Sequence, residues 1–227
     1  MIFMPMDIAF IILVLPAIIF AAWAQYRVSS SFKKYSQMPT SNGLTGAQAA
    51  KDVLQQAGVT GVTIERIAGD LTDHYDPHTA TIRLSESVYD KANVAAVGVA
   101  AHEAGHAIQH AEGYSPMKIR SAIIPVTNFG SRFAVPLVIA GFVLGIMGLV
   151  HIGIILFGAV VFFQLVTLPV EFNASNRAIA TLDGYAMLTV PEVEGAKRVL
   201  SAAALTYVGA LAISLAQLIR LILLRRR

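Results

Sequence analysis

Four long apolar runs constrain the fold of this chain more than any other feature of its sequence. A helix that crosses a bilayer needs about 20 mainly apolar residues, and runs near that length cover residues 8–24, 133–150, 152–168 and about 200–219. The chain is 56% hydrophobic and only 14% charged, whereas soluble domains average about 45–50% apolar and about 25% charged residues. The sequence therefore predicts a mainly α-helical membrane protein with four transmembrane helices.

The borders of these runs predict how the chain enters and leaves the membrane. Asp7 precedes the first run and basic residues follow it, which is the reverse of a signal peptide, so we expect an uncleaved anchor. Little more than His151 separates the second run from the third, which predicts a transmembrane hairpin with its turn at that residue. Pro169 is expected to break or kink the chain, and residues 170–182 have the spacing of a further helix.

Residues 29–118 carry more charge and predict a small α+β portion outside the membrane. Thr45 and Gln48 form a capping-box pattern at the start of a short helix. Residues 62–67 and 79–84 alternate loosely between apolar and polar, and the turn-forming residues between them predict a β-hairpin. The second strand either offers an edge to an extended substrate or is a purely structural part of the hairpin.

A helix expected over residues 93–111 carries the sequence His102-Glu103-Ala104-Gly105-His106. Positions i and i+4 lie on one helix face, so both imidazoles can reach a single Zn²⁺ while Glu103 points toward the water at the ion. Zinc lowers the pKa of that water from about 16 to about 7, and the carboxylate takes the remaining proton as the water attacks a carbonyl carbon. The pattern predicts a metallohydrolase, specifically a peptidase.

A catalytic zinc needs a third protein ligand and an open position for water. The chain has no cysteine, so the ligand must be His, Asp or Glu. Glu171 is the preferred candidate because it follows the third apolar run, on a helix that returns to the side of the histidines; its alternative role is to stabilise the helix N-terminus. Asp183 is the rival ligand. His110 would continue the histidine face, but about 12 Å along the axis from His102, and is expected outside the coordination sphere.

Several motifs that follow one another along the chain carry a resemblance to a known family. They occupy residues 73–77, 83–86, 100–109, 169–175 and 202–207. Together they resemble the YugP-like neutral zinc metallopeptidases of bacterial membranes and, more distantly, the HtpX-type membrane peptidases and CAAX prenyl proteases. The resemblance implies a zinc-dependent metalloendopeptidase of the gluzincin type, with one Zn²⁺ and with membrane proteins or peptides as substrates.

The glutamate motif departs from these distant relatives at one position. Their motif is Glu-x-x-Ala-Asp, and Glu171 and Ala174 match it, whereas Ser175 replaces the aspartate. A hydroxyl can still accept a hydrogen bond from a ligand imidazole, but it adds no negative charge.

The expected roles follow from this resemblance and from the chemistry of the motif. His102, His106 and Glu171 are the metal ligands, and Glu103 acts as general base and then as proton donor to the leaving amine. Arg177 and Tyr207 are the catalytic candidates for stabilising the oxyanion, with lipid-facing or interfacial positions as their alternatives; His74 could also donate, with a loop position as its alternative.

Two other functions remain open from the sequence. A site-2-type intramembrane protease would use Asp183 as its ligand. A non-catalytic zinc-containing membrane scaffold is the alternative outside the hydrolases, although a structural zinc needs no general base such as Glu103 and normally has four protein ligands.

The distribution of charge predicts membrane topology and partners. The net charge is +3 and the basic residues lie mainly beside apolar runs, so we expect contacts with lipid headgroups and no nucleic acid. The positive-inside rule places catalysis on the cytoplasmic side of a multi-pass plasma-membrane protein. The terminal residues Arg225, Arg226 and Arg227 disagree, because four spans would put them on the far side unless the last helix stays interfacial or buried in protein.

These predictions divide the chain into five segments. The expected segments are a first anchor (1–28), a zincin-like catalytic segment (29–118), a transmembrane hairpin (119–168), a glutamate-ligand helix with its loop (169–199) and a last transmembrane helix with a basic tail (200–227).

Overall fold

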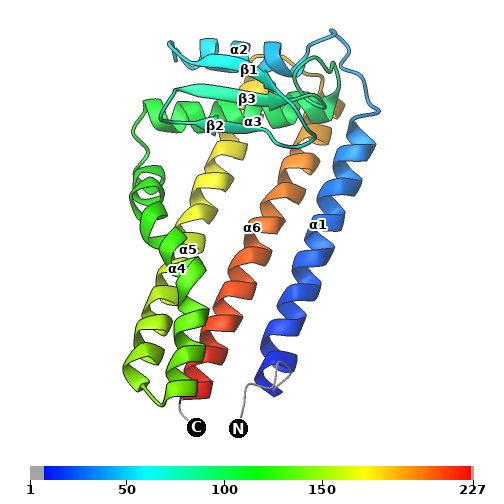
Figure 1. The fold of residues 1–227 in the computed structure, drawn as a ribbon. Helices are drawn as coiled ribbons and strands as arrows, with labels where there is room; N and C mark the ends of the chain where they lie inside the picture. Colours follow the sequence, from blue (N-terminus) through cyan, green and yellow to red (C-terminus); the bar gives the residue numbers. More distant parts are fainter. Residues whose placement is uncertain (1–7, 226–227) are drawn as a thin grey trace. The chain divides into compact units, whose positions relative to one another are not determined.

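The computed structural model describes residues 8–225, which form mainly helices (Figure 1). In chain order the elements are a π-helical turn η1 (Phe10–Val14), α1 (Leu15–Tyr35), α2 (Gly46–Gln56), β1 (Thr63–Ile67), β2 (His74–Asp76), β3 (Thr81–Ser85), α3 (Val94–Ala111), α4 (Ser115–Leu144), α5 (Met147–Gly184) and α6 (Val190–Arg225). The chain divides into two compact units. Within the described residues, the helical unit comprises 8–24, 118–168 and 205–225, and the mixed unit comprises 25–117 and 169–204.

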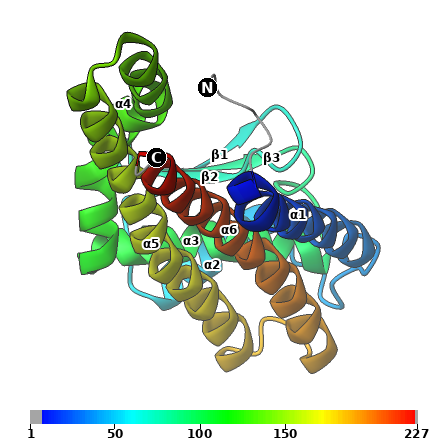
Figure 2. The same cartoon turned by 90° about the horizontal axis from the view of Figure 1, so that it is seen from below.

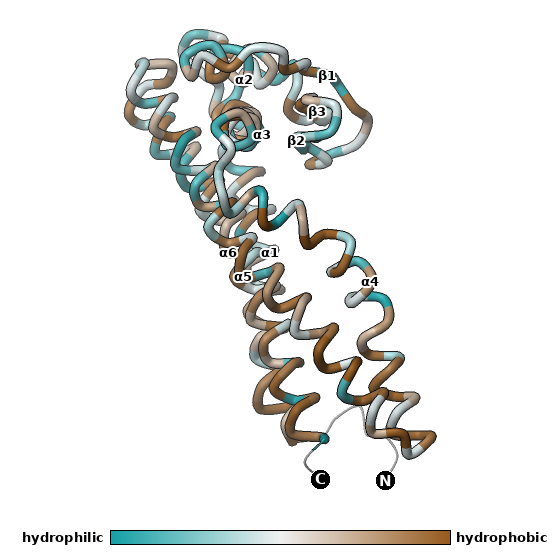
Figure 3. The backbone as a smooth tube through the Cα atoms, turned by 90° about the vertical axis from the view of Figure 1, so that its left-hand side faces the viewer, coloured by the Kyte–Doolittle hydropathy of each residue, from teal (hydrophilic) through white to brown (hydrophobic). Residues whose placement is uncertain are grey.

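The helical unit is built from the apolar parts of four helices. In the described part of the chain, η1 with α1, α4, α5 and α6 are each long and apolar enough to cross a membrane, as predicted; Figure 3 shows the apolar stretches of α4, α5 and α6 in brown. α6 lies between α1 and α5 (Figures 1 and 2), and Gly209 is so close to α1 that an added Cβ would be 3.0 Å from the Cα of Ala21. Large apolar side chains such as Ile155, which is 72% exposed, suit a surface that faces lipid.

The turn between α4 and α5 lies earlier than the sequence predicts. α4 ends at Leu144, and Gly145 adopts the left-handed conformation with φ +71°. The next N–H, of Ile146, donates to the carbonyl of Gly141 over 2.9 Å, which closes the helix end. The expected turn at His151 is therefore wrong, because a glycine in a left-handed conformation ends a helix whereas a single polar side chain does not.

α5 continues through Pro169, where a break or kink is expected from the sequence. The structure has one helix over Met147–Gly184, so residues 170–182 are helical as predicted, but the chain does not break at Pro169. Proline removes one backbone donor, but the following turns pack Val170, Ala174 and Ala178 into buried positions, and such packing outweighs the loss of one hydrogen bond. α6 likewise begins at Val190, so residues 197–198 lie in a helix rather than in a loop. Glu171 is thus carried by a continuous helix.

The sheet of the mixed unit has the strand order β1-β3-β2. The strands expected at 62–67 and 79–84 both form, as β1 and β3, but they pair in parallel, so the predicted hairpin between them is wrong. The segment between them contributes β2, which pairs antiparallel with β3. The turn that joins β2 to β3 is held by the Asp76 carboxylate, which accepts hydrogen bonds from the His78 N–H and the Thr79 hydroxyl. β3 is consequently the central strand, and the edges belong to β1 and β2.

Helices α2 and α3 pack together and complete the core of the mixed unit. Each begins at a polar cap: the Thr45 side chain accepts from the Gln48 N–H, and the Asn93 side chain accepts from the Ala96 N–H. α3 also packs against β2 and β3 (Figure 1). Val97 of α3 and Leu84 of β3 are fully buried in this core, which fixes α3 as a rigid support for the residues it carries.

Candidate metal centre

Helices α3 and α5 approach closely at Gly105, inside the mixed unit. A Cβ atom added at Gly105 would lie 2.6 Å from the carbonyl oxygen of Ala174, so a larger residue fits only if the helices separate. Glu171 precedes Ala174 by three positions and therefore lies on the same face of α5. The glycine in the histidine motif thus allows the glutamate helix to reach the histidines.

Three side chains converge where these helices meet. The Glu171 Oε2 atom lies 3.3 Å from His102 Nε2 and 3.4 Å from His106 Nε2, and the candidate ligand atoms all lie within 4.8 Å of one another. Tetrahedral zinc bonds of about 2.0–2.1 Å place neighbouring ligand atoms about 3.3–3.4 Å apart. An N–H···O hydrogen bond between charged groups is shorter, at about 2.7–2.9 Å. The separations therefore match the spacing of metal ligands.

The chemistry and burial of this triad also fit a divalent ion. Two imidazole nitrogens and one carboxylate oxygen are a common donor set for catalytic zinc, which keeps its fourth position open. Glu171 is only 2% exposed and His106 8% exposed. A carboxylate buried this deeply needs a cation or strong hydrogen-bond donors to balance the loss of hydration. His102, His106 and Glu171 could thus hold a metal ion.

The second nitrogen of each imidazole faces a protein side chain. His102 Nδ1 lies 3.0 Å from the Ser175 hydroxyl, and His106 Nδ1 lies 3.0 Å from the Gln109 Oε1 atom. Both rings therefore direct Nε2 toward Glu171. The contact of Ser175 is the one its sequence position suggests, whereas Gln109 is not among the site residues predicted from the sequence. The available signal was its spacing, because a residue three positions after His106 shares its helix face.

Glu103 is buried and contributes negative charge to this region. Burial disfavours the protonated His106 ring, but the hydrogen bond and charge of Glu171 and the charge of Glu103 outweigh burial and raise the pKa of His106. Burial raises the pKa of Asp73; hydrogen bonds from Ser85 oppose this effect and the charge of Glu103 adds to it. The Glu103 carboxyl is thus within electrostatic reach of a candidate ligand and of Asp73, which begins the motif at 73–77 but was not predicted as a site residue.

The two oxyanion candidates lie in different surroundings. Arg177 belongs to the mixed unit, where its Nη2 lies 2.7 Å from the Glu112 carboxylate and its Nε donates to the Asn173 Oδ1 atom over 2.7 Å. Tyr207 lies on α6 in the helical unit, whereas the triad belongs to the mixed unit. A catalytic role for either residue stays a prediction.

The structure brings neither Asp183 nor His110 into the triad. Asp183 is exposed and lies 12 residues after Glu171 on α5 (183 − 171), which corresponds to about 18 Å along the helix axis. The His110 ring is exposed, with its Nδ1 2.8 Å from the Tyr75 hydroxyl. His74 is also exposed, on β2, where its Nδ1 lies 2.9 Å from the Thr72 carbonyl oxygen.

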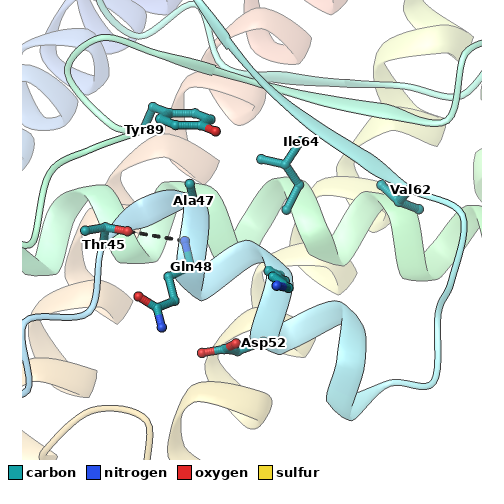
Figure 4. A pocket seen from close by; sticks show the side chains of 8 residues that line it. Thr45, Ala47, Gln48, Asp52, Val62, Ile64 and Tyr89 are labelled. Atoms are coloured by element: carbon teal, nitrogen blue, oxygen red, sulfur yellow. Dashed lines mark hydrogen bonds between the residues drawn. The ribbon is translucent and has the colours of Figure 1, made fainter.

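A separate hollow of about 520 Å³ lies between α2 and β1 (Figure 4). Val62, which directly precedes β1, and Ile64 of β1 face Gln48 and Asp52 of α2 across it, as Figure 4 shows. None of its lining residues is a candidate ligand. The hollow therefore contributes nothing to the triad.

Comparisons with known proteins add to this geometry. Residues 10–226 match the family described as "Putative neutral zinc metallopeptidase". The chain is 47% identical over 215 residues to "Putative membrane protease YugP" of Bacillus subtilis (strain 168), with 95% of this chain and 96% of that protein covered. No solved structure matches the chain.

Proposed function

Because the chain belongs to the family described as "Putative neutral zinc metallopeptidase", we propose that it is a zinc-dependent membrane endopeptidase of the gluzincin type. His102, His106 and Glu171 are the proposed ligands of one Zn²⁺, and peptide bonds of membrane proteins or membrane-associated peptides are the proposed substrates. The name of the Bacillus subtilis relative, which includes "membrane protease", and the four apolar helices support this class of substrate.

One observation carries the proposal: the Nε2 atoms of both histidines face a single buried carboxylate oxygen at 3.3 and 3.4 Å. Glu171 is far from both histidines in the sequence, and the spacing of the three ligand atoms matches a tetrahedral metal site. A helix that merely contained two histidines would not require a carboxylate buried between them, because burial of an unbalanced charge costs several kcal/mol.

The proposed mechanism assigns each side chain one task. A bound Zn²⁺ would supply a Lewis acid that activates water and polarises the scissile carbonyl. Glu103 takes a proton from the attacking water and returns it to the leaving amine. Ser175 and Gln109 orient the two imidazoles, and burial of Glu171 excludes water from its carboxylate. Arg177 and Tyr207 stay candidates for stabilising the oxyanion.

We also propose that catalysis takes place on the cytoplasmic side of the plasma membrane. Basic residues near the apolar runs are concentrated on the side that carries the triad if the chain crosses the membrane four times, and such residues favour the cytoplasm. The residues concerned are Arg27, Lys33, Lys34, Lys118, Arg120, Arg132, Arg177, Lys197 and Arg198.

Metal analysis combined with a cleavage assay tests the proposed function. The purified parent protein should contain one zinc per chain and cleave casein or a membrane-protein substrate, whereas Glu171→Ala should lose zinc and activity together. Glu103→Gln should keep zinc but lose activity, because it removes the base and leaves the ligands in place. Asp183→Ala is the matched control on the same helix and should behave like the parent.

Two results would select the alternatives. Loss of zinc in Asp183→Ala but not in Glu171→Ala would favour a site-2-type protease. A parent protein that contains zinc but cleaves no more than Glu103→Gln would favour a non-catalytic scaffold.

A further inference from the structure

Gln109 is a fully buried amide that links both of the helices that form the metal centre. From α3, its Nε2 group donates to the Val170 carbonyl over 2.8 Å and to the Asn173 Oδ1 atom over 2.9 Å, both on α5. Its Oε1 atom lies 3.0 Å from His106 Nδ1. One side chain therefore joins a candidate ligand to the helix that carries another.

The hydrogen bonds allow only one orientation of this amide. A backbone carbonyl only accepts hydrogen bonds, so the group facing Val170 must be the NH₂ of Gln109. Asn173 is oriented in the same way, because the Arg177 guanidinium only donates and its Nε lies 2.7 Å from Asn173 Oδ1. A flipped Gln109 amide would direct its oxygen at two other oxygens, in a buried position where unsatisfied groups are costly.

The orientation of the Gln109 amide then determines which nitrogen of the His106 ring carries a hydrogen. Because Gln109 Oε1 is an acceptor, the facing Nδ1 of His106 must carry a hydrogen. In the neutral ring, Nε2 is then the unprotonated nitrogen, and this atom faces Glu171 Oε2 at 3.4 Å. Successive hydrogen bonds thus connect Arg177 to Asn173, Asn173 to Gln109 and Gln109 to His106.

We propose that Gln109 is a positioning residue that holds His106 as the Nδ1–H tautomer and so presents Nε2 to a metal ion; this inference rests on the proposed function for the identity of the ion. Arg177 and Asn173 fix the direction of the Gln109 amide. His102 has no equivalent constraint from Ser175, because a hydroxyl can rotate to donate or to accept.

The test compares the parent with Gln109→Met, which keeps the length of the side chain but removes the amide. In metal-free protein with ¹⁵N-labelled histidine, NMR at a pH where the ring is neutral should show His106 as Nδ1–H in the parent and a mixture of tautomers in the variant. Zinc affinity measured by chelator competition should fall about 10- to 100-fold, the usual effect of removing such a partner. Gln55→Met, at an exposed position on α2, is the matched control and should change neither result.

Two variants of Asn173 keep the inference testable if Gln109→Met does not fold. Asn173→Asp retains an acceptor for both Gln109 and Arg177, and should keep the tautomer and the zinc affinity of the parent. Asn173→Leu removes that acceptor, and should shift the tautomer and weaken zinc binding.

The outcomes separate this inference from the proposed function. A purely structural role would lower the melting temperature of Gln109→Met while leaving the tautomer and the zinc affinity of the folded protein unchanged, and that result would overturn the inference. Equal effects of Asn173→Asp and Asn173→Leu would also overturn it. A parent that binds no zinc would contradict the proposed function, whereas the tautomer in metal-free protein would still decide the role of Gln109.

Discussion

Ser175 is the residue at which a single substitution should strengthen the metal centre. Its hydroxyl lies 3.0 Å from His102 Nδ1, and a carboxylate in its place would make the imidazole a more basic ligand. Ser175→Asp should therefore raise zinc affinity, and repulsion between the new carboxylate and Glu171 in the metal-free protein should act in the same direction. Chelator competition measures the effect; an affinity equal to or below that of the parent would show that the hydroxyl is not a partner of His102.

Asp76 should make the turn between β2 and β3 sensitive to acid. Hydrogen bonds from the Thr79 hydroxyl, the His78 N–H and Arg83 lower the pKa of Asp76 from 3.8 to about 2. A lowered pKa stabilises the folded state above the unfolded pKa, and this stabilisation is lost as the pH falls from about 3.8 toward about 2. The stability difference between the parent and Asp76→Asn should thus shrink over this interval in denaturant titrations. A difference that is independent of pH would contradict the assignment.

Single residues also show what the sequence can and cannot predict about the site. His102, Glu103, His106 and Glu171 are recognisable because metal chemistry demands particular residue types at particular positions. Gln109 and Asp73 are harder to recognise. The spacing of Gln109 from His106 is a local signal, but its contacts with Val170 and Asn173 form only because α5 packs beside α3. Asp73 likewise accepts hydrogen bonds from Ser85 only because β3 lies beside it.

At the scale of elements, the approach of α3 to α5 depends on the absence of a side chain at Gly105. Gly105→Ala should push the Ala174 backbone away, move Glu171 from the histidines, and lower both zinc affinity and stability, the latter by about 1–3 kcal/mol as for other overpacked sites. Gly98→Ala on the same helix is the matched control. Its Cβ would first meet the Ala196 side chain at 3.3 Å rather than a backbone atom at 2.6 Å.

Zinc affinity and thermal unfolding of these two variants check this prediction. The Gly105 variant should lose more of both quantities than the Gly98 variant. Equal losses would mean that the close approach of α3 and α5 does not determine the geometry of the triad.

The elements differ in how far local signals predict them. The caps at Thr45 and Asn93 act on neighbouring N–H groups, so both helix starts can be read from the sequence. The parallel pairing of β1 with β3 depends on β2, a strand of only three residues that is too short to show alternation. The continuity of α5 through Pro169 depends on tertiary packing, which local propensity does not include.

At the scale of the whole molecule, the four predicted spans are confirmed as long apolar helices. Their number follows from hydropathy because backbone groups in a bilayer must form hydrogen bonds within the segment. The ends of the helices do not follow from hydropathy, since α5 and α6 continue beyond the apolar runs into residues of the mixed unit. Hydropathy detects only the apolar part of each helix.

The proposed orientation in the membrane can be tested directly because the chain has no cysteine. Lys51 is exposed on α2 of the mixed unit, so Lys51→Cys would introduce a single reactive thiol. A maleimide that does not cross membranes should label this thiol only after the membrane is opened, as the positive-inside rule predicts. Labelling in intact cells would place the mixed unit outside the cytoplasm.

Zinc K-edge X-ray absorption of the purified protein tests the proposed metal centre most directly. The spectrum should fit four light-atom neighbours at about 2.0–2.1 Å, with the scattering pattern of two imidazole rings, and Glu171→Ala should abolish the bound zinc. A bound zinc with fewer than two imidazoles, or an unchanged spectrum in Glu171→Ala, would contradict coordination by His102, His106 and Glu171.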